Sequence, residues 1–437
     1  MTKKTQQLSI KSPWIPLIWV AYLLVPTAFF IIFPIHQLLY EHLGLYYNQL
    51  RILQLLTFAM LTMTAWLLDL RLPITLSSRL FLAALVVGLL SCMHAGKITI
   101  GLQEVALTTL LALSTLAMLP ALYDRNGRNT WLLLICLLPI IPSVLLLSEI
   151  PLRFPAVLWN QSFGNIRIFD DSMLPLIFLC AGIMIERGWK VFALLLPAIY
   201  LFGLLIDSSR SGLLSYIATI AILWVIPSRT AAHHALRVLL LAVTIFIIVL
   251  LTADNFDYSL IRTTSSGRVE IYIVSFANWQ HNLWLGIGPG SFNHLAQGIP
   301  SSHPHNIIWQ WLYEWGLLGG SLLFTSGCCL LSQLWQKRHQ LDPWALAALI
   351  AFLCNSLFGG AMIYPGTQLM LILLMALLFG DIPSGTMQQG IRIYWPMLIA
   401  LAVILIIQCQ YIIELFQGIT WHNLHIGPRF WAQGQHF

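Results

Sequence analysis

The chain has 437 residues, of which 58% are hydrophobic and only 9% are charged, whereas soluble domains carry about 25% charged residues. This composition excludes a water-soluble globular domain and predicts a polytopic membrane protein, with aromatic residues at 12% as in membrane-interface belts. The net charge of +6 is too dispersed for nucleic-acid binding, because that function needs a basic stripe on one face.

Thirteen apolar segments approach the length of about 20 residues that a membrane-spanning helix needs. The spans must be helical because lipid offers no hydrogen-bond partner to exposed backbone groups. We therefore predict an all-α polytopic integral membrane protein with about 12 to 13 transmembrane helices. The segments cover residues 14–35, 51–70, 80–95, 104–122, 131–149, 172–187, 190–206, 211–227, 235–252, 316–335, 343–359, 364–380 and 394–415.

The first segment follows Lys3, Lys4 and Lys11 and has no small-residue cleavage site, which predicts a retained span. The chain then divides into N-terminal transmembrane helices (1–252), one large loop (253–315), C-terminal helices (316–415) and a tail (416–437).

The basic residues of the loops predict the orientation of the chain. With the N-terminus inside, fourteen of the 22 Lys and Arg lie in inside loops, as the positive-inside rule requires. The other eight face outside, against that rule, so functional residues are expected among them. The outside set is Arg51, Lys97, Arg153, Arg167, Arg210, Arg262, Arg268 and Arg429.

Three short polar motifs lie on the predicted outer side. Residues 207–212 (Asp-Ser-Ser-Arg-Ser-Gly) join two spans, residues 266–268 (Ser-Gly-Arg) open a possible surface helix over 267–284, and residues 302–306 (Ser-His-Pro-His-Asn) precede an amphipathic aromatic stretch. In the surface helix, Val269, Ile273, Phe276 and Ala277 would share one face.

Each arginine has a structural and a functional interpretation. Arg210 lies at the outer membrane boundary, where it could extend to lipid headgroups, and Arg268 could be a solvated loop charge. If the two converged, they would suit a lipid pyrophosphate, because guanidinium groups bind phosphate oxygens bidentately and stay charged.

The third motif leaves several interpretations open. His303 and His305 flank Pro304 and could be ordinary interfacial residues, metal ligands without a supporting carboxylate, or a general base or phosphate-binding donor. Asn306 could orient its neighbour or cap the next helix, and capping is favoured.

Two further features lie near these motifs. The run Gly286-Ile-Gly288-Pro-Gly290 has no P-loop lysine, so it predicts a turn that folds the loop back instead of a nucleotide site. Asp207 and Glu314 lie beside the basic motifs and could pair with an arginine or act as a base.

These motifs resemble the superfamily of O-antigen ligases, O-antigen polymerases and bacterial protein O-oligosaccharyltransferases in their order along the chain and in their common side of the membrane. The resemblance covers best about residues 195–380. Such ligases are usually described with twelve spans and both ends inside, so either one short segment here is re-entrant or the tail lies outside.

The resemblance implies a C-type glycosyltransferase in the bacterial inner membrane with its active site facing the periplasm. The donor would be a glycan on undecaprenyl pyrophosphate, and the acceptor a lipid A-core sugar, a growing glycan or a protein hydroxyl, with ligase ranked first. Transfer would be inverting and would need no metal and no cofactor. Arg210 and Arg268 would bind the pyrophosphate and His305 would be the essential histidine. The remaining substrate-binding candidates are His303, Asn306, Ser211, Asp207 and Glu314.

The alternative from another class is a transporter or flippase for a lipid-linked glycan. Transporters place polar sites near the bilayer midplane and tend to show internal repeats. This chain shows no repeat, and its polar residues gather in one outer loop. The pattern therefore favours an interfacial enzyme.

Overall fold

The computed structural model of the protein describes residues 14–32, 35, 46–96, 98–149, 166–226, 228–252, 267–294, 303–381 and 390–416. Within these residues the chain is almost entirely helical, and its only strands are β1 (Arg71–Pro73) and β2 (Gly390–Arg392). The helices of the first part are α2 (Trp14–Thr27), η1 (Ala28–Ile32), α4 (Tyr46–Leu67), α5 (Leu76–His94), α6 (Ile98–Met118), η2 (Leu119–Leu122), α7 (Arg125–Leu137) and α8 (Ile140–Glu149). Those of the second part are α10 (Ile166–Glu186), α11 (Lys190–Ile206), α12 (Arg210–Val225), α13 (Arg229–Thr252), α14 (Arg268–Gln280), η3 (Ser291–His294), α15 (Ile307–Gln336), α16 (Pro343–Ser356), α17 (Pro365–Gly380) and α18 (Tyr394–Phe416).

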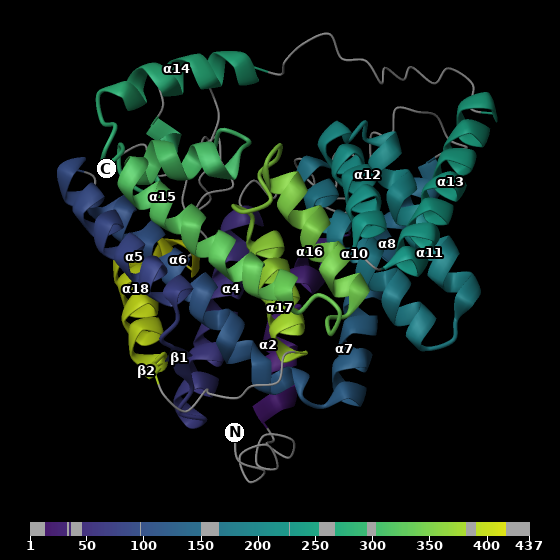
Figure 1. Ribbon diagram of the computed structural model, residues 1–437, viewed down its shortest axis with the longest axis horizontal. Coiled ribbons are helices and arrows are strands. Elements are labelled where there is room, and N and C mark those ends of the chain that lie inside the picture. The colour runs from purple at the N-terminus through teal and green to yellow at the C-terminus, as the bar shows by residue number, and fades with distance from the viewer. Residues whose placement is uncertain are drawn as a thin grey trace.

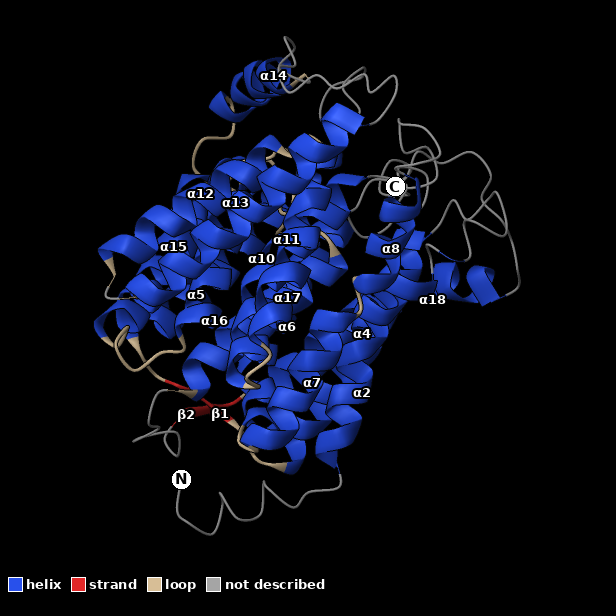
Figure 2. Ribbon diagram, turned by 90° about the vertical axis from the view of Figure 1, so that its right-hand side faces the viewer, coloured by secondary structure: helices blue, strands red, loops and turns tan. Residues whose placement is uncertain are grey.

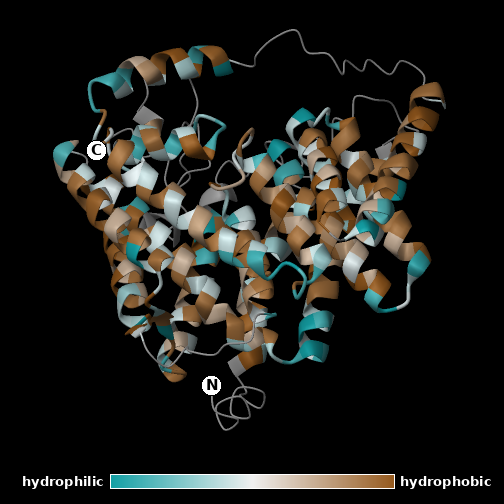
Figure 3. Ribbon diagram, viewed as in Figure 1, coloured by the Kyte–Doolittle hydropathy of each residue, from teal (hydrophilic) through white to brown (hydrophobic). Residues whose placement is uncertain are grey.

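The described residues contain eight helical stretches that are long and apolar enough to cross a membrane, and five shorter apolar helices, α11, α12, α16, α17 and α18. These thirteen stretches coincide one for one with the predicted apolar segments. An all-α polytopic membrane fold is thereby confirmed. Figure 3 shows hydrophobic residues along the bodies of the helices and hydrophilic residues mainly at their ends and connections.

The helices differ strongly in how far they are enclosed. In α10, 94% of the apolar window is buried, against 28% in α13. Helix α10 packs against α7, α11 and α16 and forms the centre of the bundle. Helix α13 instead presents large apolar side chains such as Leu240 and Leu251 outward, as expected of a helix that faces lipid.

The bundle has two distinct ends (Figures 1 and 2). At one, which we call the ribbon end, β1 pairs with β2 in antiparallel register, with Leu72 opposite Ile391. Asp69 accepts ion pairs there from Arg71 at 3.0 Å and Arg392 at 2.9 Å. At the other, the α14 end, helix α14 lies across the tops of the neighbouring helices.

Helix α14 covers residues 268–280 of the helix predicted over 267–284, and Gly267 is its N-cap. Val269, Ile273, Phe276 and Ala277 are all exposed on it, as the amphipathic pattern predicts.

Helix α15 is broken at Gly316, which has φ 70° and ψ −178°, a conformation open essentially to glycine alone. The segment 283–288 fills the break. Its carbonyl groups at 283 and 284 accept the amides of residues 317 and 318 at 2.8 and 3.2 Å. Its amides at 287 and 288 donate to the carbonyls of residues 313 and 314 at 3.1 and 3.0 Å. The glycine run therefore folds the loop back, as predicted, and completes the hydrogen bonding of the broken helix.

Several helices begin earlier than the hydropathy pattern predicts, among them α10 and α15. Helix α15 starts at Ile307, and its break coincides with the predicted start at residue 316. Helix α10 starts at Ile166 in place of residue 172, because its first turn carries polar residues that an apolar window excludes.

Candidate functional site

The candidate site lies at the α14 end, where α10, α12, α14 and α15 begin. Arg210 is the first residue of α12, Arg268 is the first residue of α14, and His305 lies just before α15. Burial lowers the pKa of Arg268, and the positive charges of Arg210 and Arg167 lower it further. Burial and the charge of Arg268 lower the pKa of His305 to about 4. The structure thus brings Arg210, Arg268 and His305 within electrostatic range, together with Arg167.

The turn between α11 and α12 places Arg210. Asp207 ends α11, Ser208 adopts a left-handed conformation with φ 52°, and the amide of Arg210 donates to the Ser208 carbonyl at 2.9 Å. A Cβ at Gly212 would lie 2.9 Å from the Ser209 hydroxyl, so the glycine of the first motif permits this tight turn. Ser211 is half-buried in the same turn of α12.

Arg268 is placed by the docking of α14 on the N-terminal part of α15. Gly267 precedes it with φ 74°, a left-handed conformation that glycine adopts without strain. The Trp309 indole donates to the Ser275 hydroxyl at 2.8 Å and stacks on Phe276 at a centroid distance of 6.0 Å. This contact connects α14, and with it Arg268, to the helix that follows the histidine motif.

The histidine motif forms a tight corner. The rings of His303 and His305 lie 4.2 Å apart, and His303 is 5% exposed. His305 has φ 57°, a conformation that costs energy for a residue with a Cβ and that gathers at functional sites. The Asn306 side chain accepts the amide of Trp309 at 2.9 Å, so the predicted capping role is confirmed.

The connection between α16 and α17 forms the wall beside His303. A Cβ at Gly360 would lie 2.5 Å from Nε2 of His303, and the Tyr364 ring packs edge-on at 6.1 Å. From within the bundle, Arg51 supports this connection. It is 2% exposed and donates to the Ile363 carbonyl at 2.7 Å, and it also binds the side chains of Gln54 and Gln368.

The first turn of α10 supplies residues that the sequence-based site did not include. Arg167 forms an ion pair with Asp170 at 3.1 Å. Asp170 lies within hydrogen-bonding reach of Asp207 and the Ser209 hydroxyl. Asp171 accepts the Asn355 side-chain amide at 2.6 Å. A usable signal existed for Arg167, since it is one of the eight basic residues that the positive-inside rule leaves unexplained.

Residues 192–324 match the family model described as O-antigen ligase. Over this segment the chain is similar to the O-antigen ligases. The matched segment contains all eight site residues predicted from the sequence, whereas Arg167, Asp170, Asp171 and Asn355 lie outside it. No curated protein matches the chain. The O-antigen ligase family consists of glycosyltransferase-like membrane enzymes whose substrates are lipid-linked glycans.

Glu314, one of the eight site residues predicted from the sequence, contacts the glycine run. Its carboxylate accepts the Phe292 amide at 3.1 Å, and its backbone carbonyl accepts from Gly288 at 3.0 Å and from the Ser91 hydroxyl at 3.2 Å. Glu314 is 1% exposed. These contacts give it a packing role at the break of α15, and its predicted part in substrate binding stays a prediction.

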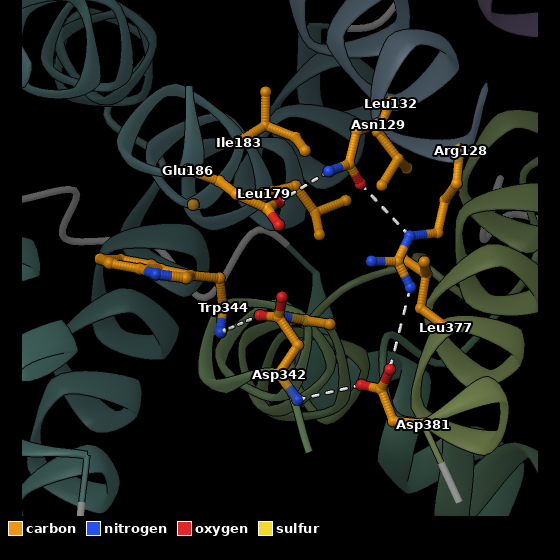
Figure 4. Close-up of a pocket in the computed structure, with 12 residues that line it drawn as sticks. Arg128, Asn129, Leu132, Leu179, Ile183, Glu186, Asp342, Trp344, Leu377 and Asp381 are labelled. Atoms are coloured by element: carbon orange, nitrogen blue, oxygen red, sulfur yellow. Dashed lines mark hydrogen bonds and ion pairs between the residues drawn. The ribbon is translucent and has the colours of Figure 1, made fainter. Parts of the chain in front are cut away.

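A separate small pocket lies at the ribbon end, between α7, α10, α16 and α17. Figure 4 shows that its polar side chains pair with one another: Arg128 with Asp381 at 3.8 Å, and Asn129 with Glu186 at 3.0 Å. Burial raises the pKa of Asp381. The pocket is remote from the predicted site motifs and lies where four helices meet at the ribbon end. Over the described ranges, no group of three or more His, Cys, Asp or Glu could hold a metal ion.

Proposed function

We propose that the protein is an O-antigen ligase of the bacterial inner membrane. It would transfer a glycan from undecaprenyl pyrophosphate to the lipid A-core oligosaccharide on the periplasmic face, with inversion at the anomeric carbon and without a metal ion. The family match supports the reaction class, and the cation cluster at the α14 end supports the donor.

The observation that carries this proposal is the gathering of Arg210, Arg268 and Arg167 at three separate helix starts. Like charges repel, so an anionic ligand stabilises a partly buried group of guanidinium ions. Helix N-termini add partial positive charge at α10, α12 and α14. A diphosphate supplies enough negative charge and enough acceptor oxygens for such a group.

In the proposed reaction, the acceptor hydroxyl oxygen forms a bond to the anomeric carbon of the donor. The bond from that carbon to the pyrophosphate oxygen breaks on the opposite face, which inverts the configuration and releases undecaprenyl pyrophosphate. Arg210 and Arg268 stabilise the negative charge that builds on the leaving oxygen, an effect that is often the largest part of catalysis.

His305 would take the proton of the acceptor hydroxyl. Its pKa of about 4 keeps the ring neutral at pH 7, as a base requires. Binding of an anionic donor would offset the charge of Arg268 and so raise the pKa of His305 towards its ordinary value, which strengthens it as a base when substrate is present. The alternative role, a hydrogen bond to phosphate, uses the same position.

Transfer by purified protein in lipid vesicles tests the proposal. With undecaprenyl-pyrophosphate-linked glycan and lipid A-core supplied, Arg210→Ala, Arg268→Ala and His305→Ala should each lower the rate about 100-fold or more. Arg79→Ala is a matched control because Arg79 is exposed on α5 near the ribbon end. Wild-type rates in all three site variants would overturn the proposal.

The acceptor is tested in the native host. Deletion of the gene should abolish long-chain lipopolysaccharide and cause undecaprenyl-linked polymer to accumulate. Parallel gels of lipopolysaccharide and of glycoproteins measure the outcome. Lipopolysaccharide that still carries glycan but lacks the long chains would indicate a polymerase. Loss of glycoproteins would indicate a protein glycosyltransferase. Counterflow of lipid-linked glycan across vesicles without any transfer would indicate a transporter.

A further inference from the structure

Two adjacent aspartates, Asp170 and Asp171, lie buried in the first turn of α10. Only 1% of Asp170 and 5% of Asp171 is exposed. Removing carboxylates from water is costly unless specific partners compensate. Both residues precede the apolar part of the helix and lie outside the segment matched by the family model.

Asp170 contacts the turn that carries Arg210. One carboxylate oxygen accepts from Arg167 at 3.1 Å, and the carboxyl group also lies within hydrogen-bonding reach of Asp207 and Ser209. Two carboxyl groups in contact must share a proton or be bridged by cations. Asp170 thereby fixes the residues immediately before Arg210.

Asp171 contacts a different connection, the one between α16 and α17. It accepts the side-chain amide of Asn355 at 2.6 Å and the backbone amide of Gly360. A Cβ at Gly359 would lie only 3.2 Å from its Oδ1. The opposite side of Gly360 faces Nε2 of His303, so this connection is held between Asp171 and the histidine motif.

Consecutive residues of an α-helix point about 100° apart, so the two carboxylates reach two different structures from one helical turn. We propose that Asp170 positions Arg210 for the donor diphosphate, and that Asp171 positions the histidine motif for proton transfer. The inference rests on the proposed function, because it assigns donor binding to the Arg210 turn and proton transfer to the histidine motif. Both aspartates are positioning residues that act through the neighbouring connections.

The pair offers a test in which each variant controls the other. Asp170→Ala and Asp171→Ala remove the same atoms from adjacent, almost fully buried positions, so a general loss of structure would affect both in the same way. The two readouts are the affinity for undecaprenyl pyrophosphate, measured by tryptophan fluorescence in detergent, and the transfer rate at saturating donor in vesicles.

Asp170→Ala should weaken undecaprenyl pyrophosphate binding about tenfold or more, because the Arg210 turn is released. Asp171→Ala should leave that affinity within about twofold and lower the saturated rate about tenfold or more. Gly360→Ala, which disturbs the same connection from its other side, should reproduce the Asp171→Ala result. If either alanine variant fails to accumulate, its asparagine counterpart, which keeps the side-chain volume, is scored by the same two readouts.

Equal effects of the two substitutions on both readouts would overturn the inference, as would wild-type behaviour of either variant. Arg210→Ala and His305→Ala in the same assays separate this outcome from failure of the proposed function. If these two lose activity while the aspartate variants behave alike, only the positioning roles are wrong. If Arg210→Ala and His305→Ala retain full transfer, the proposed function itself is wrong.

Discussion

Replacing Gly316 by alanine should destabilise the protein through the break in α15. A Cβ there would lie 2.3 Å from the carbonyl oxygen of Trp284 and 2.5 Å from the amide nitrogen of Gly286. The backbone conformation alone costs an alanine about 1 to 3 kcal/mol. Displacing segment 283–288 would also weaken its four backbone hydrogen bonds, each with a net value of about 0.5 to 1.5 kcal/mol. The expected loss is therefore about 3 kcal/mol or more.

Thermal unfolding in detergent, followed by tryptophan fluorescence, measures this loss. Gly327→Ala is the matched control, because Gly327 lies in the same helix and a Cβ there meets nothing within 4 Å. Alanine is favoured over glycine in a regular helix by about 1 kcal/mol, so this variant should unfold at the wild-type temperature or slightly above it. A Gly316→Ala protein that unfolds together with the control would refute the reasoning.

Three further predictions concern the site. The pH at which kcat/KM declines on the acid side reports the free enzyme and should lie well below 6.5, because the lowered pKa of about 4 keeps His305 neutral as the pH drops. A decline centred at pH 6.5 that disappears in His305→Ala would contradict this. Asn306→Ala should cost about 1 kcal/mol of stability through loss of the helix cap, and Asn306→Ser should restore most of it in the same melting assay. Glu314→Gln should lower the melting temperature, because it weakens the charge-assisted hydrogen bond that the Glu314 carboxylate accepts from the Phe292 amide. The rate of glycan transfer in vesicles, measured below that temperature, should stay within about threefold of wild type. A loss of rate comparable to that of Arg268→Ala would instead place Glu314 at the substrate.

The helical framework could be predicted from the sequence because lipid imposes a strong and uniform rule on apolar segments. All thirteen predicted segments correspond to helices. The same rule did not detect the first turn of α10, because the polar residues Arg167, Asp170 and Asp171 lie outside the apolar segment. The burial of the two aspartates depends on partners at the ends of α11, α12 and α16, and no local pattern reports such partners.

The site residues show the same division between local and distant information. Motif order and the positive-inside rule led to Arg210, Arg268 and His305, and the structure brings these three together. Arg51 was also among the unexplained outside cations, but its position inside the bundle was not predicted. Its burial requires the carbonyl of Ile363, which approaches only when α4 and α17 pack together.

The segment 283–288 also limits how the molecule can open. Withdrawing it from α15 would leave two amides and two carbonyls of the helix without partners, and each such buried group costs about 1 to 3 kcal/mol. The break is consequently held closed by these hydrogen bonds. Passage of a bulky, lipid-anchored substrate to the arginines should therefore depend on movement of other segments, while the N-terminal third of α15 and the histidine motif before it stay in place.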